Sequence, residues 1–334
     1  MRTTEPLRTE TTIADDLVLR RDASRILRLI PVGMMFLILV VLSVVVPYFL
    51  SVSNFISILL QCSSLGLMAI GLTAVLIAGG IDLSVPSLMS FSAVVGAIFM
   101  RSGGSPVLAS ILMVVVATAG GCLNGFAVAY LRMIPFVVTL STMAVFGGAA
   151  IWATNGMSVT GIPRGFITTV MHDIWIFPAP VVVFIVVSIV VHLFMTRSLY
   201  GRWLYAVGTN IRAARVSRIP AQQILFGSYV FSGFVAGLAA IVTTAWLGTA
   251  GGTIGSEGVV LDVVSSAVLG GVSIYGGVGT ALGAFVGTIF IKLISNTLNF
   301  LQASYYMTLV VKGIVIVAFV AIDSLFRRRY GGTL

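Results

Sequence analysis

The sequence has very little charge. Only 9% of its 334 residues are charged, whereas 58% are hydrophobic and the mean hydropathy is +1.12. So few polar side chains cannot cover the surface of a soluble globule of this length. The composition therefore excludes a soluble protein and predicts an all-α integral membrane protein with spans along nearly the whole chain.

Cysteine, histidine and nucleotide-binding motifs are equally scarce. Cys62 and Cys122 lie in apolar runs without metal-ligand spacing, and His172 and His192 have no second ligand near them, so no metal site is expected. No G-x-x-x-x-G-K-[ST] motif occurs, so any ATP hydrolysis that drives this chain takes place in a separate protein. No set of catalytic side chains can be assembled either, and we expect a chain that is not an enzyme and holds no cofactor.

Long apolar stretches, in contrast, are abundant. Ten windows are long enough to cross about 30 Å of hydrocarbon, and we expect a helix at each. They lie at residues 30–50, 59–79, 86–101, 106–130, 135–153, 179–196, 223–247, 258–275, 281–301 and 305–325. With the N-terminus inside, fifteen of the nineteen basic residues face the cytoplasm, so the positive-inside rule places both termini there.

The predicted organisation is one membrane domain, residues 30–326, with a cytoplasmic tail at each end, 1–29 and 327–334. Two loops are long: a periplasmic loop at 154–178 and a cytoplasmic loop at 197–223. The net charge of +9 is interpreted as a topology signal and a contact with lipid headgroups, and nucleic acid is not an expected partner.

The cytoplasmic loop carries five arginines and no acid. Asn210 is a favourable N-cap and Pro220 prevents continuation, so a short helix is predicted between them. Arginines recur there at every third residue and form a basic stripe. The stripe consists of Arg212, Arg215 and Arg218, and the other side of the helix presents Ala213 and Val216. Such a helix suits either a lipid surface or a soluble partner, and we favour the partner.

The stretch AGGIDLSVPS, residues 78–87, interrupts an apolar region. Gly79 and Gly80 can end one helix. Asp82 or Ser84 can cap the next, and Pro86 is tolerated in its first turn. We therefore predict a broken helix here, in which Asp82 is structural first and contacts substrate second, if at all.

Three further charges lie in the apolar region. Asp262 opens an apolar run at 258–271, a short and weakly specific repeat of the pattern at the break, and we expect it to be structural. Lys292 and Lys312 fall within predicted spans. Because a charge at the bilayer centre costs about 2.5 to 3.5 kcal/mol on insertion scales, we expect each lysine to pair with an aspartate in the bundle or to snorkel. Lining of a substrate path is the other interpretation.

Five stretches carry a resemblance to a known family. They are GLTAVLIAGGIDLSV (71–85), LNGFAVAYLRMIPFVVTLSTM (123–143), GRWLYAVGTNIRAARVSRI (201–219), LDVVSSAVLGGVSIYGGVGTALGAFVG (261–287) and VKGIVIV (311–317). In this order they resemble the permease subunits of ribose-type ABC sugar importers, which also include galactose, arabinose, xylose and autoinducer-2 permeases. The resemblance extends from about residue 30 to the end. The family usually has glycine where this chain has Pro86 and Arg218.

The resemblance implies a multi-pass subunit of the bacterial inner membrane that moves a monosaccharide by alternating access. It implies as partners a second copy or a paralogue, two ATPase subunits that bind ATP and Mg, and a periplasmic or lipid-anchored sugar-binding protein. The cytoplasmic helix then corresponds to the coupling helix that the ATPase receives. Its residues are Asn210, Arg212, Ala213, Ala214, Arg215, Ser217 and Arg218.

Neutral polar side chains in the spans are candidates for the path of a sugar, because hydroxyl groups pair with amides and hydroxyls without a fixed charge. The candidates are Gln61, Asn124, Thr139, Ser141 and Asn296. Each could equally join two helices. The alternative function is an ion-coupled secondary transporter of a small polar solute, which would need intramembrane carboxylates that the spans offer only sparsely.

Overall fold

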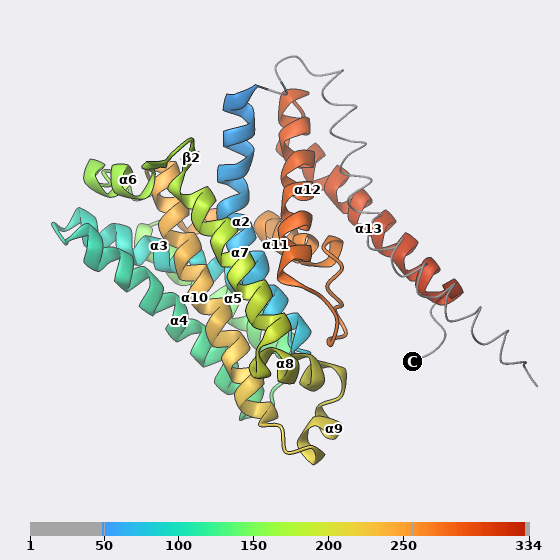
Figure 1. Cartoon of the computed structure of the whole chain (residues 1–334). Helices are drawn as coiled ribbons and strands as arrows, with labels where there is room; N and C mark the ends of the chain where they lie inside the picture. The colour runs from blue at the N-terminus through green and yellow to red at the C-terminus, as the bar shows by residue number, and fades with distance from the viewer. Residues whose placement is uncertain (1–48, 50, 256, 331–334) are drawn as a thin grey trace, which may run out of the picture.

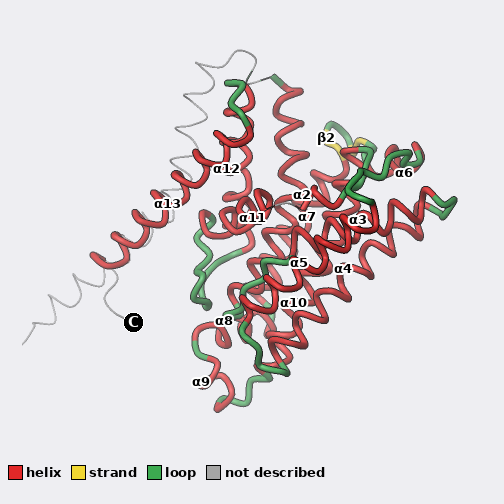
Figure 2. Tube along the Cα trace, turned by 180° about the vertical axis from the view of Figure 1, so that it is seen from behind, coloured by secondary structure: helices red, strands yellow, loops and turns green. Residues whose placement is uncertain are grey.

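The computed structural model describes Phe49 and residues 51–255 and 257–330, and residues 1–48, 50, 256 and 331–334 lie outside the description. The described chain is almost entirely helical (Figures 1 and 2). The helices are α2 (Val52–Ile77), α3 (Val85–Arg101), α4 (Pro106–Ala129), α5 (Pro135–Thr154), α6 (Arg164–Val170), α7 (Ala179–Arg197), α8 (Leu199–Thr209), α9 (Ile211–Val216), α10 (Ala221–Leu247), the 3-10 helix η1 (Gly252–Gly255), α11 (Glu257–Leu269), α12 (Ala281–Phe300) and α13 (Tyr305–Tyr330).

Six of the described helices are long and apolar enough to cross a membrane: α2, α4, α5, α7, α10 and α12. They contain 19 to 27 residues, or roughly 28 to 40 Å at 1.5 Å per residue. Helix α3 has 17 residues and α11 has 13, and the apolar part of α13 is limited to Tyr305–Ala318. The described residues therefore contain six candidate spans, fewer than the ten that the sequence windows predicted for the chain. The predicted span at 30–50 and the N-terminal tail are not described.

The predicted window at 258–275 is wrong as one continuous span. Helix α11 ends at Leu269, and Gly271 follows in a left-handed conformation with φ +79°. The Val272 N–H donates to the Ala267 carbonyl at 3.1 Å and the Gly271 N–H to the Val268 carbonyl at 2.9 Å, which closes the helix in a Schellman motif. A loop then leads to α12.

Helix α10 lies at the centre of the bundle, packed against α2, α3 and α4 (Figure 1). Small residues allow this close approach. A Cβ added at Gly121 of α4 would meet the Tyr229 carbonyl of α10 and lie 3.0 Å from the α carbon of Gly233. Gly71 of α2 similarly lies against Ser232. The backbone of α10 thus lies in close contact with α4 and α2.

The predicted helix break is confirmed. The Gly79 N–H donates to the Leu76 carbonyl and the Gly80 N–H to the Val75 carbonyl, both at 2.9 Å, which ends α2 in a second Schellman motif with Gly79 at φ +83°. Residues 80–84 are not helical, and α3 begins at Val85 with a proline in its first turn.

The long loop at 154–178 has a definite structure. It contains α6 and a small antiparallel hairpin of β1 (Asp173–Ile174) and β2 (Phe177–Pro178), in which Asp173 pairs with Pro178. Val159 and Ala250 exchange backbone hydrogen bonds of 2.7 and 3.1 Å and tie the loop to the segment after α10. Its location on the periplasmic side stays a prediction, as do the cytoplasmic positions of the termini.

Candidate functional site

The segment 80–84 is held by a buried hydrogen-bond network. Asp82 is 1% exposed. Its Oδ1 accepts from the Ser84 N–H at 3.1 Å and the Ser84 hydroxyl at 2.6 Å, and its Oδ2 accepts from the Ser232 hydroxyl of α10 at 3.0 Å. Asp82 thus caps the turn before α3, while Ser84 occupies the N-cap position without a side-chain capping bond. The structural role predicted for Asp82 matches this arrangement.

Two predicted path residues also contact this segment. Asn124 of α4 donates its Nδ2 to the Ser84 Oγ at 2.7 Å. The Thr139 hydroxyl of α5 is shared between the Pro135 carbonyl of its own helix at 3.0 Å and the Ile81 carbonyl at 3.2 Å. Tyr229 of α10 donates to the same carbonyl at 3.0 Å. Asn124 and Thr139 are both fully buried, and the Asn124 Oδ1 has no hydrogen-bond partner among the described residues. Three helices therefore fix the position of the break.

The other three path candidates lie elsewhere. Asn296 of α12 is 8% exposed and pairs with Asn54 of α2 through amide hydrogen bonds of 2.9 and 3.4 Å. Gln61 is half-buried on α2, and Ser141 is exposed on α5. Only Asn124 and Thr139 are thus brought to a common segment, and substrate contact by any of the five stays a prediction.

A charged cluster joins α11, α12 and α13. The Lys312 ammonium lies 2.8 and 3.0 Å from the two carboxylate oxygens of Asp262, and the Lys292 Nζ lies 3.7 Å from its Oδ2. The pairing expected for both lysines is confirmed. Asp262, however, sits inside α11 and does not open a helix, which corrects the suggested repeat of the pattern at Asp82. The cluster carries two ammonium groups on one carboxylate.

The predicted cytoplasmic helix is α9. The Asn210 Oδ1 accepts from the backbone N–H groups of Arg212 and Ala213 at 3.0 Å, which confirms the N-cap. The helix ends at Val216, well before Pro220. The reason is a Schellman motif in which Arg218 adopts φ +58°.

This early end changes the faces of α9. Arg218 lies outside the helix, so the arginine stripe is reduced to Arg212 and Arg215, both exposed. Ala214 is 4% exposed and packs into the protein, so it cannot contact a partner directly. Val216 is 86% exposed. Ser217 is exposed at the C-cap.

A cluster of glycines connects the segment before α9 to the helix break. We define the glycine junction as Gly79, Gly208, Gly276 and Gly277. A Cβ at Gly208, near the end of α8, would collide with the Ile77 carbonyl oxygen at the end of α2. The Gly277 N–H donates to that same carbonyl at 3.0 Å, and Gly276 lies against both Gly208 and Gly79. The backbone of α8, the end of α2 and the loop at 270–280 are therefore in direct contact.

Helix α8 is also fixed by tyrosine side chains. Tyr205 donates its hydroxyl to the Gly279 carbonyl at 2.8 Å, and Tyr200 donates to the Ile224 carbonyl of α10 at 3.2 Å. Burial raises the pKa of both phenols above the ordinary value of 10, so both remain hydrogen-bond donors at neutral pH. Sequence reasoning missed the junction because its glycines come from three distant segments.

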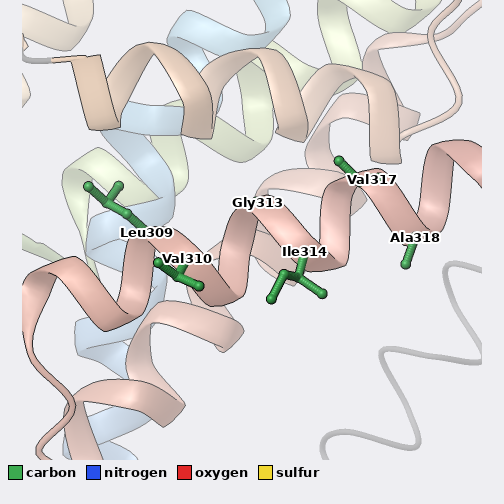
Figure 3. A pocket seen from close by; sticks show the side chains of 6 residues that line it. All are labelled: Leu309, Val310, Gly313, Ile314, Val317 and Ala318. Carbon is green, nitrogen blue, oxygen red and sulfur yellow. The ribbon is translucent and has the colours of Figure 1, made fainter.

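A groove of about 540 Å³ runs along α13 but is unsuited to a polar solute (Figure 3). Its lining is apolar, and Val310, Ile314 and Val317 are 60 to 69% exposed. Such a surface suits hydrocarbon or another apolar helix.

Comparisons with known proteins agree on one family. The model described as "Branched-chain amino acid transport system / permease component" matches residues 54–320. The chain is 33% identical to the ribose import permease protein RbsC of Bacillus subtilis, over 86% of this chain and 90% of the relative. It is 35% identical to the D-allose transport system permease protein AlsC of Escherichia coli (84% and 86%). It is 29% identical to the galactose/methyl galactoside import permease protein MglC of Haemophilus influenzae (87% and 93%). No solved structure matches the chain.

Replacement of Asp82 tests the break. Asp82→Asn keeps an acceptor for Ser84 and can donate to the Ser232 oxygen, so we expect normal assembly and uptake. Asp82→Ala leaves buried donors without an acceptor, which costs about 1 to 3 kcal/mol for each group, and we expect a lower unfolding temperature in detergent. An Asp82→Asn protein that assembles normally but does not transport would show that the carboxylate serves substrate or ion binding.

Replacement within the charged cluster should give an ordered series. Asp262→Asn leaves two lysines without a carboxylate, and we expect it to destabilise the fold by about 3 to 5 kcal/mol. Lys292→Met leaves the Lys312 pair intact and should cost much less. Lys312→Met, with Lys292 still near Asp262, should fall between them. Thermal unfolding of the three purified variants measures the order, and a Lys292→Met protein as unstable as Asp262→Asn would contradict it.

Proposed function

The chain belongs to the family of ribose-type sugar ABC permeases, and on that premise we propose that it passes a monosaccharide across the inner membrane by alternating access. It is a multi-pass protein of the bacterial inner membrane, as its family and the six candidate spans among the described residues indicate. The relatives are named for ribose, allose and galactose, which supports a substrate of that size and polarity. The single structural observation that carries the proposal is the glycine junction.

The ATP-binding subunits dock on residues 210–219 in this proposal. They bind ATP and Mg and hydrolyse the nucleotide, while a second permease copy or a paralogue and a sugar-binding protein complete the importer. The exposed arginines and Val216 of α9 offer the docking surface, and Asn210 fixes the start of the helix.

The glycine junction gives this docking a route into the membrane domain. A displacement of α9 moves α8, which directly precedes it in sequence, and Gly208 of α8 lies against the Ile77 carbonyl. That carbonyl lies at the end of α2, immediately before the unwound segment that Asp82 organises. Close-packed backbone transmits displacement because it has no side chain to rearrange. The ATP-driven movement thereby reaches the helix break.

The ion-coupled alternative finds less support in the described residues. Asp82 and Asp262 are 1% and 6% exposed, and their oxygens already accept hydrogen bonds from hydroxyl, amide or ammonium groups. A coupling carboxylate must instead exchange a cation with water during each cycle.

The energy source is the direct test. We expect sugar uptake into proteoliposomes that contain the permease, its ATP-binding subunit and its sugar-binding protein to require ATP and to continue with an uncoupler present. The same vesicles without the ATP-binding subunit are the control. Uptake that persists without ATP and collapses with the uncoupler would favour the ion-coupled transporter.

Gly208→Ala tests the route through the junction. The added methyl would meet the Ile77 carbonyl, and we expect uptake per hydrolysed ATP to fall about fivefold or more, the lower end of typical coupling effects. Gly148→Ala is the matched control, because a Cβ there meets no atom within 4 Å. Complex assembly is checked by size-exclusion chromatography. Equal uptake per ATP in both variants, once assembled, would contradict the role of the junction.

A further inference from the structure

A second groove, of about 290 Å³, opens beside α9. It combines two guanidinium groups, two side-chain amides and the apolar turn that follows the helix. Its lining includes Arg132, Arg215, Ile219, Pro220, Gln222 and Gln223.

The groove joins two distant parts of the chain. Arg215 belongs to α9, whereas Arg132 lies in the connection between α4 and α5 and is exposed. The lining residues lie where α9, the end of α4 and the start of α10 meet, at the end of the bundle that α9 occupies in Figure 1. A body that contacts α9 there also contacts the α4–α5 connection.

The backbone beside the groove is strained at two arginines. Arg132 and Arg218 both adopt φ +58°, a left-handed conformation that L-residues other than glycine rarely take. Each such residue costs on the order of 1 to 2 kcal/mol. Strain of this kind persists where the surrounding structure fixes it, often at binding surfaces.

The charge of the groove is one-sided. No aspartate or glutamate occurs between residues 83 and 172 or between 174 and 256, so neither segment supplies a counter-charge. Within the described residues, neither Arg132 nor Arg215 forms an ion pair. Guanidinium groups bind carboxylates through two parallel hydrogen bonds, and the glutamines can donate further hydrogen bonds.

We propose that this groove receives an acidic side chain of the ATP-binding subunit, so that Arg132 provides a second docking contact beside α9. The inference rests on the proposed function. The groove is concave and lined by amides, and the helix beside it projects beyond the ends of α4 and α10 (Figure 1). Such a site fits a protein carboxylate better than a lipid phosphate, because flat basic surfaces already attract lipid phosphates. The ATPase would then hold α9 and the α4–α5 connection together as one surface.

The test measures the affinity of the full-length permease in nanodiscs for its purified ATP-binding subunit. We expect Arg132→Glu to weaken binding about tenfold or more, Arg132→Gln to weaken it less, and Arg132→Lys to weaken it least. Arg202→Glu is the matched control, since Arg202 is an exposed arginine of α8 outside the groove, and we expect a change of about twofold or less. Arg132→Gln also serves if Arg132→Glu fails to assemble.

Each other outcome overturns the proposal. Equal losses in Arg132→Glu and Arg202→Glu would indicate a general charge effect without a specific groove. Normal ATPase binding with reduced binding of short-chain phosphatidylglycerol would assign the groove to lipid. Stronger ATPase binding on deletion of residues 1–29, reproduced by Arg132→Glu, would assign the groove to one of the five acidic residues of that N-terminal segment. Failure of the unaltered permease to bind any ATP-binding subunit would instead contradict the proposed function itself.

Discussion

An unwound segment inside a membrane bundle must find all its hydrogen-bond partners within the protein, because hydrocarbon offers none. Side chains from three helices supply hydrogen-bond partners to residues 80–84. Asp82 supplies the acceptor for the turn, and Tyr229 and Thr139 supply donors for the Ile81 carbonyl. The positions of α4, α5 and α10 are therefore tied to the same short segment, and packing errors at any of them would expose unsatisfied backbone groups.

The charged cluster follows the same physical rule, and an unpaired buried charge costs more free energy than an unpaired backbone group. One buried carboxylate with a bidentate lysine at 2.8 and 3.0 Å forms a complete pair, and a second lysine at 3.7 Å adds a charge that the pair does not need for its own neutrality. Lys292 is the more exposed of the two lysine side chains, 19% against 8%. The cluster therefore joins α11 and α13 through Lys312, and Lys292 is the replaceable member.

Local features were predictable from the sequence, and long-range ones were not. The end of α2 at Gly79 and the cap at Asn210 depend on neighbouring residues alone, so their patterns were sufficient. The place of Asp262 within α11 and the burial of Ala214 were missed. Both depend on where a helix starts or stops, and Arg218 ends α9 by adopting a conformation that its residue type disfavours. The groove at Arg132 depends on segments about 80 residues apart, which no local pattern connects.

In the proposed function, the glycine junction is what allows the short helix α9 to act on a distant break. A side chain between α8 and α2 could change its rotamer and absorb a displacement, whereas backbone atoms in contact can only move together or separate. The hydrogen bond from the Gly277 N–H to the Ile77 carbonyl opposes separation, and the contact with Gly208 opposes closer approach. That hydrogen bond joins α2 to the loop at 270–280, and Tyr205 of α8 is held to the same loop through the Gly279 carbonyl. In the proposed mechanism a movement of α8 in either sense is therefore passed to the segment that Asp82 holds.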